Sequence, residues 1–212
     1  MSNKLAIKTP RLSAKLISSD FQNLEDESFY TGVVFKDCIL TDVSFEKICF
    51  KNTSFINVHF KNCVFYQIEL IDVVFENCDI SNTEMIESII QRTHFSNTKL
   101  LGTNFAESSM MDVLFSSCFA NYSSFSYGSL KQVYFDCTAL IESDFYEIKW
   151  KQLYFDQCDL NGINLMQTNL TTLDLSTSTF EKIGISIDLL KGVTLSSVQA
   201  LVIASTLGVN IK

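Results

Sequence analysis

A five-residue period runs through most of the chain. From residue 35 to residue 185 every fifth residue is apolar, without exception. Phe is the commonest residue at these positions, and the others are Leu, Ile, Met, Ala120 and Trp150. A period of five matches neither an amphipathic helix nor an ordinary strand. We therefore expect a solenoid, in which each short unit contacts only its neighbours.

A second constraint lies two residues before each apolar centre. From residue 33 to residue 183 these positions hold small or apolar residues and never a charge. Most of the cysteines lie there: Cys38, Cys63, Cys78, Cys118 and Cys158. Each pentad is thus expected to place one large and one smaller side chain inside, where close packing is required, and its other three residues outside.

The pentads resemble the pentapeptide-repeat family. The resemblance rests on CDISN at 78–82, TNFAE at 103–107, SDFYE at 143–147 and CDLNG at 158–162. It implies an all-β fold, a right-handed quadrilateral β-helix with four pentads in each coil. The sequence fits such a coil, because residues 35, 55, 75, 95, 115, 135 and 155 are all Phe. Coils about 4.8 Å apart would hold the cysteines of alternate coils roughly 9.6 Å apart, too far for disulfides.

Both ends of the chain depart from the repeat. Residues 1–27 are interpreted as an N-terminal cap, with the basic strip 4–15 either mobile or covering the open edge of the rod. Residues 28–195 form the β-helix, and residues 196–212 a C-terminal helical element. Ser196 is the expected N-cap and Gly208 the residue after the helix. This apolar helix either packs on the last coil or forms a two-fold homodimer interface, which we predict to contain Val198, Leu201, Val202, Ser205 and Leu207.

Several function classes find no support in the sequence. A net charge of −8 argues against a protein that binds nucleic acid directly. The sequence contains no metal-ligand spacing, phosphate-binding loop or nucleophile motif. His59 and His94 are expected on different sides of the rod, so neither is expected to activate a nucleophile. We therefore predict a protein that is not an enzyme and uses no cofactor. A carbohydrate-cleaving β-helix would need loop insertions, which the unbroken period does not leave. Without a long apolar run or a secretory signal, a thiol-rich chain is expected in the cytoplasm, away from membranes.

The acidic residues fall mainly on two opposite sides of the predicted square. We name the four faces after their first centres: Phe35, Leu40, Phe45 and Phe50. The candidate partner-binding residues are Glu76, Asp136 and Asp156 on the Phe35 face, and Glu84, Glu87, Glu107, Asp144 and Glu147 on the Phe45 face. The Phe50 face is net basic. Such acidic faces either keep a β-rich rod in solution or steer it into a protein groove that normally holds DNA.

Residues 28–212 resemble the Qnr-type quinolone-resistance proteins, especially those of Gram-positive bacteria. The resemblance is carried by GTNFAESSMMDVLFSSC at 102–118, ALIESDFYEIKWKQLYFDQCDL at 139–160 and VQALVIASTLG at 198–208. It implies a homodimeric DNA mimic that binds DNA gyrase and topoisomerase IV and counters fluoroquinolones. Many such proteins have loops that interrupt the pentads. This chain has none, so binding is expected through the faces of the rod. The alternative is a scaffold that binds another cytosolic protein.

Overall fold

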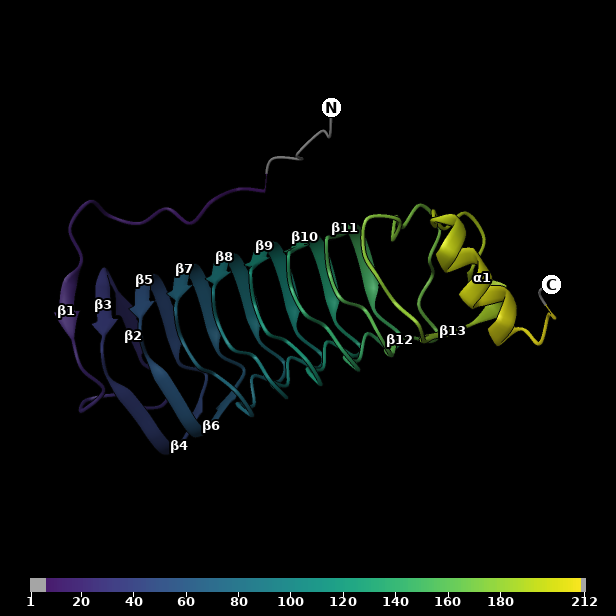
Figure 1. Ribbon diagram of the computed structural model, residues 1–212. Helices are drawn as coiled ribbons and strands as arrows, with labels where there is room; N and C mark the ends of the chain where they lie inside the picture. Colours follow the sequence, from purple (N-terminus) through teal and green to yellow (C-terminus); the bar gives the residue numbers. More distant parts are fainter. Residues whose placement is uncertain (1–6, 211–212) are drawn as a thin grey trace.

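The chain forms a rod-shaped β-helix with one helix at its C-terminal end (Figure 1). The computed structural model describes residues 7–210. Its strands are β1 Ile17–Ser19, β2 Phe29–Thr31, β3 Val33–Lys36, β4 Ile39–Glu46, β5 Cys49–Ile56, β6 His59–Tyr66, β7 Glu69–Glu76, β8 Ile89–Ser96, β9 Ser109–Ser116, β10 Ser129–Asp136, β11 Lys149–Asp156, β12 Ile163–Leu165 and β13 Ile183–Ile185. The 3₁₀ helix η1 spans Ile187–Leu189 and the α-helix α1 spans Ser197–Thr206. The expected all-β solenoid with a short C-terminal helix is confirmed.

Successive coils pair in parallel and in a constant register. Phe75 pairs with Phe95, and Phe95 pairs with Phe115, one coil later in each case. The main sheet has the order β1-β3-β5-β7-β8-β9-β10-β11, with β2 also beside β5, and forms the Phe50 and Phe35 faces. On the other two faces β4 pairs with β6, and the later coils are joined by single bridges such as Glu84 with Asn104. Two adjacent faces are therefore regular sheet, and the other two are rich in turns.

The corners of the square are made by left-handed residues. Every fifth residue from Glu27 to Thr172 has a positive φ, between 47° at Arg92 and 76° at Gly162. Most of these residues are Asn, Asp, Gln or Glu, and only a few are Gly. Asn and Asp adopt this conformation more readily than other residues with a side chain. This device explains how a chain with seven Gly and one Pro bends so often.

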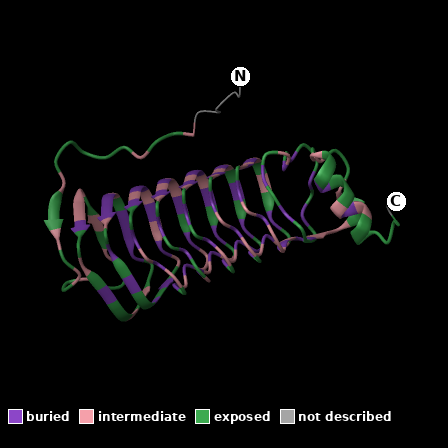
Figure 2. Ribbon diagram, in the orientation of Figure 1, coloured by how far each residue is buried: buried purple, intermediate pink, exposed green. Residues whose placement is uncertain are grey.

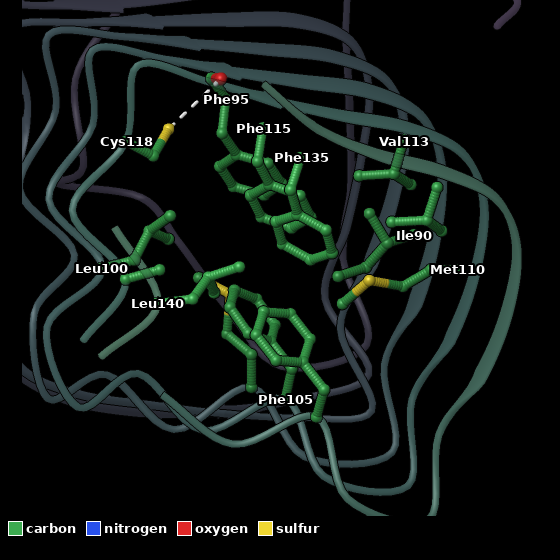
Figure 3. Close-up of a cluster of buried hydrophobic side chains, with 14 of the residues drawn as sticks. Ile90, Phe95, Leu100, Phe105, Met110, Val113, Phe115, Cys118, Phe135 and Leu140 are labelled. Carbon is green, nitrogen blue, oxygen red and sulfur yellow. Dashed lines mark hydrogen bonds between the residues drawn. The ribbon is translucent and has the colours of Figure 1, made fainter. Parts of the chain in front are cut away.

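The interior is a stack of rings. Figure 3 shows Phe95, Phe115 and Phe135 in one column, with ring centroids 4.8 and 4.6 Å apart and nearly parallel planes. Phe125, from the opposite side, meets Phe115 edge-on at 5.8 Å. The residues two before each centre also point inward. Cys118, for example, donates through Sγ to the Phe95 carbonyl oxygen at 3.4 Å. The predicted inward positions are thus confirmed from residue 48 to residue 183, except that Trp150 is only half-buried (Figure 2).

Of the cysteines in the predicted column, Cys78, Cys118 and Cys158 are buried packing residues, as predicted, and Cys38 is half-buried. No disulfide occurs within residues 7–210. Burial raises the pKa of the Cys118 and Cys158 thiols to about 12. Such thiols remain protonated near neutral pH and are poor nucleophiles.

The N-terminal segment closes the first coil and then lies along the rod. β1 pairs with β3, and the Phe21 ring stacks on Phe35 at 4.6 Å, covering the place that a further coil of the repeat would give to Lys15. The basic strip was expected to be mobile or to cover the open edge. Its described part instead runs along the Phe50 face (Figure 1), because carboxylates on that face bind its backbone and its cations. Residues 4–6 lie outside the described residues.

The C-terminal helix packs on the last coils through one polar and one apolar side chain. Ser196 is the N-cap and accepts a hydrogen bond from the Gln199 amide at 3.3 Å. Gly208 follows the helix with a φ of 78°. Both predicted helix ends are therefore confirmed. Gln199 and Ile203 are buried. Neither helix in the described part of the chain is long and apolar enough to cross a membrane.

Candidate partner-binding surface

A line of carboxylates follows one corner of the Phe45 face. Glu87, Glu107 and Glu147 occupy the same left-handed corner position in different coils, with φ between 51° and 60°. Glu107 and Glu147 are exposed and Glu87 is half-buried. At about 4.8 Å per coil, Glu87 lies one coil from Glu107, and Glu147 lies two coils beyond it. The structure therefore brings these three predicted residues into one column, with Tyr127 between them.

A second acidic column runs beside the first. Glu84 and Asp144 lie just before their apolar centres, and single β-bridges connect the residues between them from coil to coil. Glu84 Oε2 accepts a hydrogen bond from Asn104 Nδ2 at 2.7 Å, and Asp144 Oδ1 accepts one from Asn164 Nδ2 at 3.0 Å. These bonds hold both carboxylates in place. We call Glu84, Glu87, Glu107, Asp144 and Glu147 the Phe45 acidic surface.

Tyrosines that the sequence analysis did not select lie among these acids. The Tyr66 hydroxyl donates to Glu87 Oε1 at 2.6 Å, which lowers the pKa of Glu87 and raises the pKa of Tyr66. The rings of Tyr127 and Tyr146 meet edge-on at 5.5 Å and line an open hollow of about 410 Å³ beside Asp144. Tyr127 is 57% exposed, and exposed tyrosines often anchor protein partners. Tyr127 could have been recognised from the sequence, because it interrupts the column of glutamates.

The predicted acids of the Phe35 face lie apart from this surface. Asp136 and Asp156 end β10 and β11 as direct neighbours, and Asp156 Oδ2 accepts from the Tyr134 hydroxyl at 2.8 Å. Burial and this bond raise the pKa of Tyr134. Glu76 ends β7, three coils away, and is exposed. Because the Phe35 and Phe45 faces are opposite, the eight predicted residues form two separate surfaces.

The Phe50 face is more basic than its own sequence indicates. Its carboxylates Asp72 and Asp112 are only 5% and 0% exposed. Arg92 pairs with Asp72 through two hydrogen bonds of 2.6 and 2.8 Å, and Lys8 approaches Asp112 at 3.8 Å. The N-terminal segment adds further cations to this face. The acidic surfaces are thus separated by a side of opposite sign.

The outer side of α1 exposes apolar residues. Val198 and Leu201 are 67% and 50% exposed, and Ser205 is exposed on the same side. At 100° per residue, these three point away from the buried Gln199 and Ile203. Two further predicted interface residues lie at the margins: Val202 is half-buried on the flank, and Leu207 is exposed at the C-cap. An apolar patch therefore marks the C-terminal end of the rod.

The described residues do not meet the requirements of a metal site. Within residues 7–210, no group of three or more His, Cys, Asp or Glu side chains could hold a metal ion. His59 and His94 lie on different faces, and burial lowers the pKa of His94.

Comparisons with known proteins agree with the fold, a β-helix built from five-residue units. The family model described as pentapeptide repeat region matches residues 68–142 and 88–165. Among solved structures, the chain is similar to a trypsin-treated form of QnrB1, a plasmid-mediated fluoroquinolone resistance protein. The two share 20% identity over 93% of this chain and 97% of that chain, with a TM-score of 0.51.

Two further solved structures resemble the chain more weakly. Full-length QnrB1 shares 18% identity over 87% of this chain and 97% of that chain, with a TM-score of 0.49. HetL, a pentapeptide repeat protein involved in heterocyst differentiation regulation from the cyanobacterium Nostoc, shares 12% identity over 80% and 87% of the two chains, with a TM-score of 0.40. At such identities the likeness concerns the fold. No curated protein sequence matches the chain.

Proposed function

We propose that this chain binds the type II topoisomerases DNA gyrase and topoisomerase IV as a DNA mimic and protects them from fluoroquinolones. The observation that carries the proposal is the Phe45 acidic surface, where carboxylates recur along a rod at the spacing of its coils. A protein groove that binds duplex DNA is positively charged, and complementary charge steers a partner of opposite sign into it. The likeness in fold to a fluoroquinolone resistance protein supports this target.

The Phe45 acidic surface is the proposed docking side. Its corner glutamates project from fixed backbone positions, so little backbone ordering is required on binding. Tyr127 and Tyr146 supply aromatic surface between the charges. Glu76, Asp136 and Asp156 on the opposite face form a second, sparser contact. Since no loop interrupts the pentads between residues 33 and 185, the faces of the rod make the contact themselves.

The remaining parts of the proposal follow from the ends of the rod. We infer a homodimer formed through the outer side of α1, which would join two rods at their C-terminal ends. Residues 1–27 serve as the cap, residues 28–195 as the rod and residues 196–212 as the dimerisation element. The protein acts in the cytoplasm by binding, without catalysis or cofactor and without direct contact with nucleic acid or a membrane.

A gyrase supercoiling assay with ciprofloxacin tests the proposed function. Wild-type protein at low doses should restore supercoiling, or at high doses inhibit it. The triple variant Glu87→Lys, Glu107→Lys and Glu147→Lys should do neither. Lys47 occupies the same corner column with a φ of 55°, so lysine fits these positions.

The matched control makes the same change in net charge on the Leu40 face. Asp42→Lys, Glu142→Lys and Glu181→Lys should leave the wild-type effect intact. If wild-type protein neither restores nor inhibits supercoiling at any dose, the topoisomerase proposal is wrong. A scaffold for another protein then becomes the better account.

A further inference from the structure

The N-terminal segment lies along the Phe50 face in the manner of a bound peptide. We call residues 7–16 the strap and Asn52, Asp72, Arg92 and Asp112 the strap groove. The strap runs from the coil of Asp112 back toward β1 (Figure 1). Its backbone amides at Lys8, Arg11 and Ser13 donate to Asp112 Oδ1, Asp72 Oδ1 and Asn52 Oδ1, at 3.3, 3.0 and 2.7 Å.

The strap groove is built from corner residues that elsewhere face solvent. Asp72 and Asp112 are 5% and 0% exposed, whereas Asp37 and Asp42, at the same position of other faces, are exposed. Asp112 Oδ2 is buried without a hydrogen-bond partner among the described residues, and it forms an ion pair with the Lys8 ammonium at 3.8 Å. Asp72 is held by both the strap and Arg92. Burying two carboxylates is costly unless a cation or donor compensates them, so the groove favours a cationic occupant.

The spacing of the groove matches an extended chain. Asp72 and Asp112 lie two coils apart, which is roughly 9.6 Å at the parallel-strand spacing. Three residues of extended chain, as from Lys8 to Arg11, span about 10 Å. The groove therefore fits an extended segment whose amides at positions i and i+3 reach the two carboxylates, and the charges of Lys8 and Arg11 act on those carboxylates.

Apolar burial contributes little to holding the strap on the rod. None of residues 7–16 is buried, and only Ile7, Pro10 and Leu16 are half-buried (Figure 2). Segments with little apolar burial open at low free-energy cost, so the strap can leave while the rod stays folded. From these observations we propose that the strap groove is an exchangeable binding site for an extended basic segment of a partner protein, with cations three residues apart, and that the strap occupies it in cis.

This site is distinct from the Phe45 acidic surface. It lies on another face and selects a peptide by its backbone and cation spacing, whereas the acidic surface is proposed to enter a DNA groove. In the free protein the tethered strap competes at a high effective concentration, so an untethered peptide binds weakly until the strap is displaced. The two proposals can therefore fail separately.

The first test asks whether the carboxylates hold the strap. In the full chain, Asp72→Asn and Asp112→Asn keep the shape of the groove and every basic residue of the strap. Trypsin should cleave this variant after Arg11 about 10-fold faster than wild type. The control Asp37→Asn and Asp42→Asn, at the same corner position of other faces, should be cleaved at the wild-type rate. An unchanged rate in the groove variant would overturn the proposal.

The second test asks whether the groove accepts a peptide in trans. The probe is a fluorescent peptide of residues 7–16, followed by anisotropy. The full-chain variant Lys8→Glu and Arg11→Glu repels its own strap and should bind the peptide at least about 10-fold more tightly than wild type does. Adding Asp72→Asn and Asp112→Asn should abolish that gain.

A peptide of the same composition with its cations adjacent is the matched control, and it should bind poorly. Equal binding of both peptides would mean general charge attraction and would contradict the proposal. So would a strap-repelling variant that binds no better than wild type. Circular dichroism of each variant checks that the β-helix is intact.

Discussion

At the scale of single residues, the fold depends on two kinds of position. The centre of each pentad fills the interior with a ring or an aliphatic chain, and the corner takes a left-handed conformation. The sequence predicted the first kind, because apolar residues recur every five positions. It did not predict the second, since corner residues as different as Arg92, Tyr122 and Cys137 share one conformation that their chemistry does not favour. Backbone pairing between coils imposes that conformation.

The Phe115 ring illustrates the cost of losing a centre. Phe115 is fully buried and stacked at 4.8 and 4.6 Å between Phe95 and Phe135. Phe115→Ala should lower the free energy of unfolding by about 3–5 kcal/mol, because it leaves a cavity inside the stack. Ser116→Ala, one residue further on and facing outward, should change it by less than about 0.5 kcal/mol. Urea denaturation measures both, and equal effects would contradict the assigned inward position.

At the scale of elements, polar side chains hold the C-terminal helix α1 and the N-terminal strap against the rod. The sequence predicted a capped helix from Ser196 to Gly208, but its selection of apolar residues missed Gln199. The Gln199 Nε2 donates to the carbonyls of Leu175 and Ser178 at 2.7 and 2.8 Å, and its Oε1 accepts from the Ser196 amide at 2.8 Å. The spacing of Ser196 and Gln199 is that of a capping box, a signal that could have found this residue.

Replacing Gln199 should therefore loosen α1. Gln199→Leu leaves the buried carbonyls of Leu175 and Ser178 without their donor, at a cost of about 1–3 kcal/mol. Hydrogen exchange should become faster at the amides of α1 and stay unchanged in β7–β10. The exposed Ser205→Ala is the control. Equal protection of α1 in wild type and Gln199→Leu would show that the glutamine does not hold the helix.

Asp72, which binds both Arg92 and the strap, should make stability depend on pH. Burial tends to raise the pKa of Asp72, but the hydrogen bonds from Arg92 and from the Arg11 amide, with the charges of both arginines, lower it below its ordinary value of 3.8. Asp112 and Lys8 lie on the same face and also act on this cluster. A lowered pKa in the folded state gives stability that is present above pH 3.8 and is lost as the pH falls through the folded value.

The comparison of wild type with Asp72→Asn isolates this effect. Above pH 5 wild type should be the more stable of the two, and below about pH 3 the difference should shrink, because a protonated Asp72 resembles asparagine. Denaturant titrations across this range measure it. A difference in stability that is constant with pH would mean that the charge of Asp72 does not contribute to the stability of the folded protein.

At the scale of the whole molecule, charge is arranged by face. The acidic residues were assigned to faces from the sequence, because the repeat fixes which residues share a column. What the sequence could not place was the strap, since its pairing with the Phe50 face depends on contacts between residues as far apart as Lys8 and Asp112. The division into cap, rod and C-terminal element, and the partner-binding roles of the acids, stay predictions.

The outer side of α1 should determine the oligomeric state. Val198→Glu and Leu201→Glu place two charges on the exposed apolar patch and should convert a dimer into a monomer, because a charge buried without a partner is strongly disfavoured. Ser109→Glu and Ser129→Glu make the same change in charge at exposed positions of the rod, away from α1, and should leave the dimer intact. Sedimentation equilibrium gives the molar mass of each. A monomeric wild-type protein would exclude this interface.

The most direct test of the central claim is competition with DNA on gyrase. Labelled duplex DNA is bound to gyrase, and the wild-type protein should displace it, less effectively as the salt concentration rises. The variant Glu87→Lys, Glu107→Lys and Glu147→Lys should lose displacement, and the Leu40-face control should keep it. If wild-type protein binds gyrase while the DNA remains bound, or if the triple variant displaces DNA as well as wild type does, the Phe45 acidic surface does not act as a mimic of DNA.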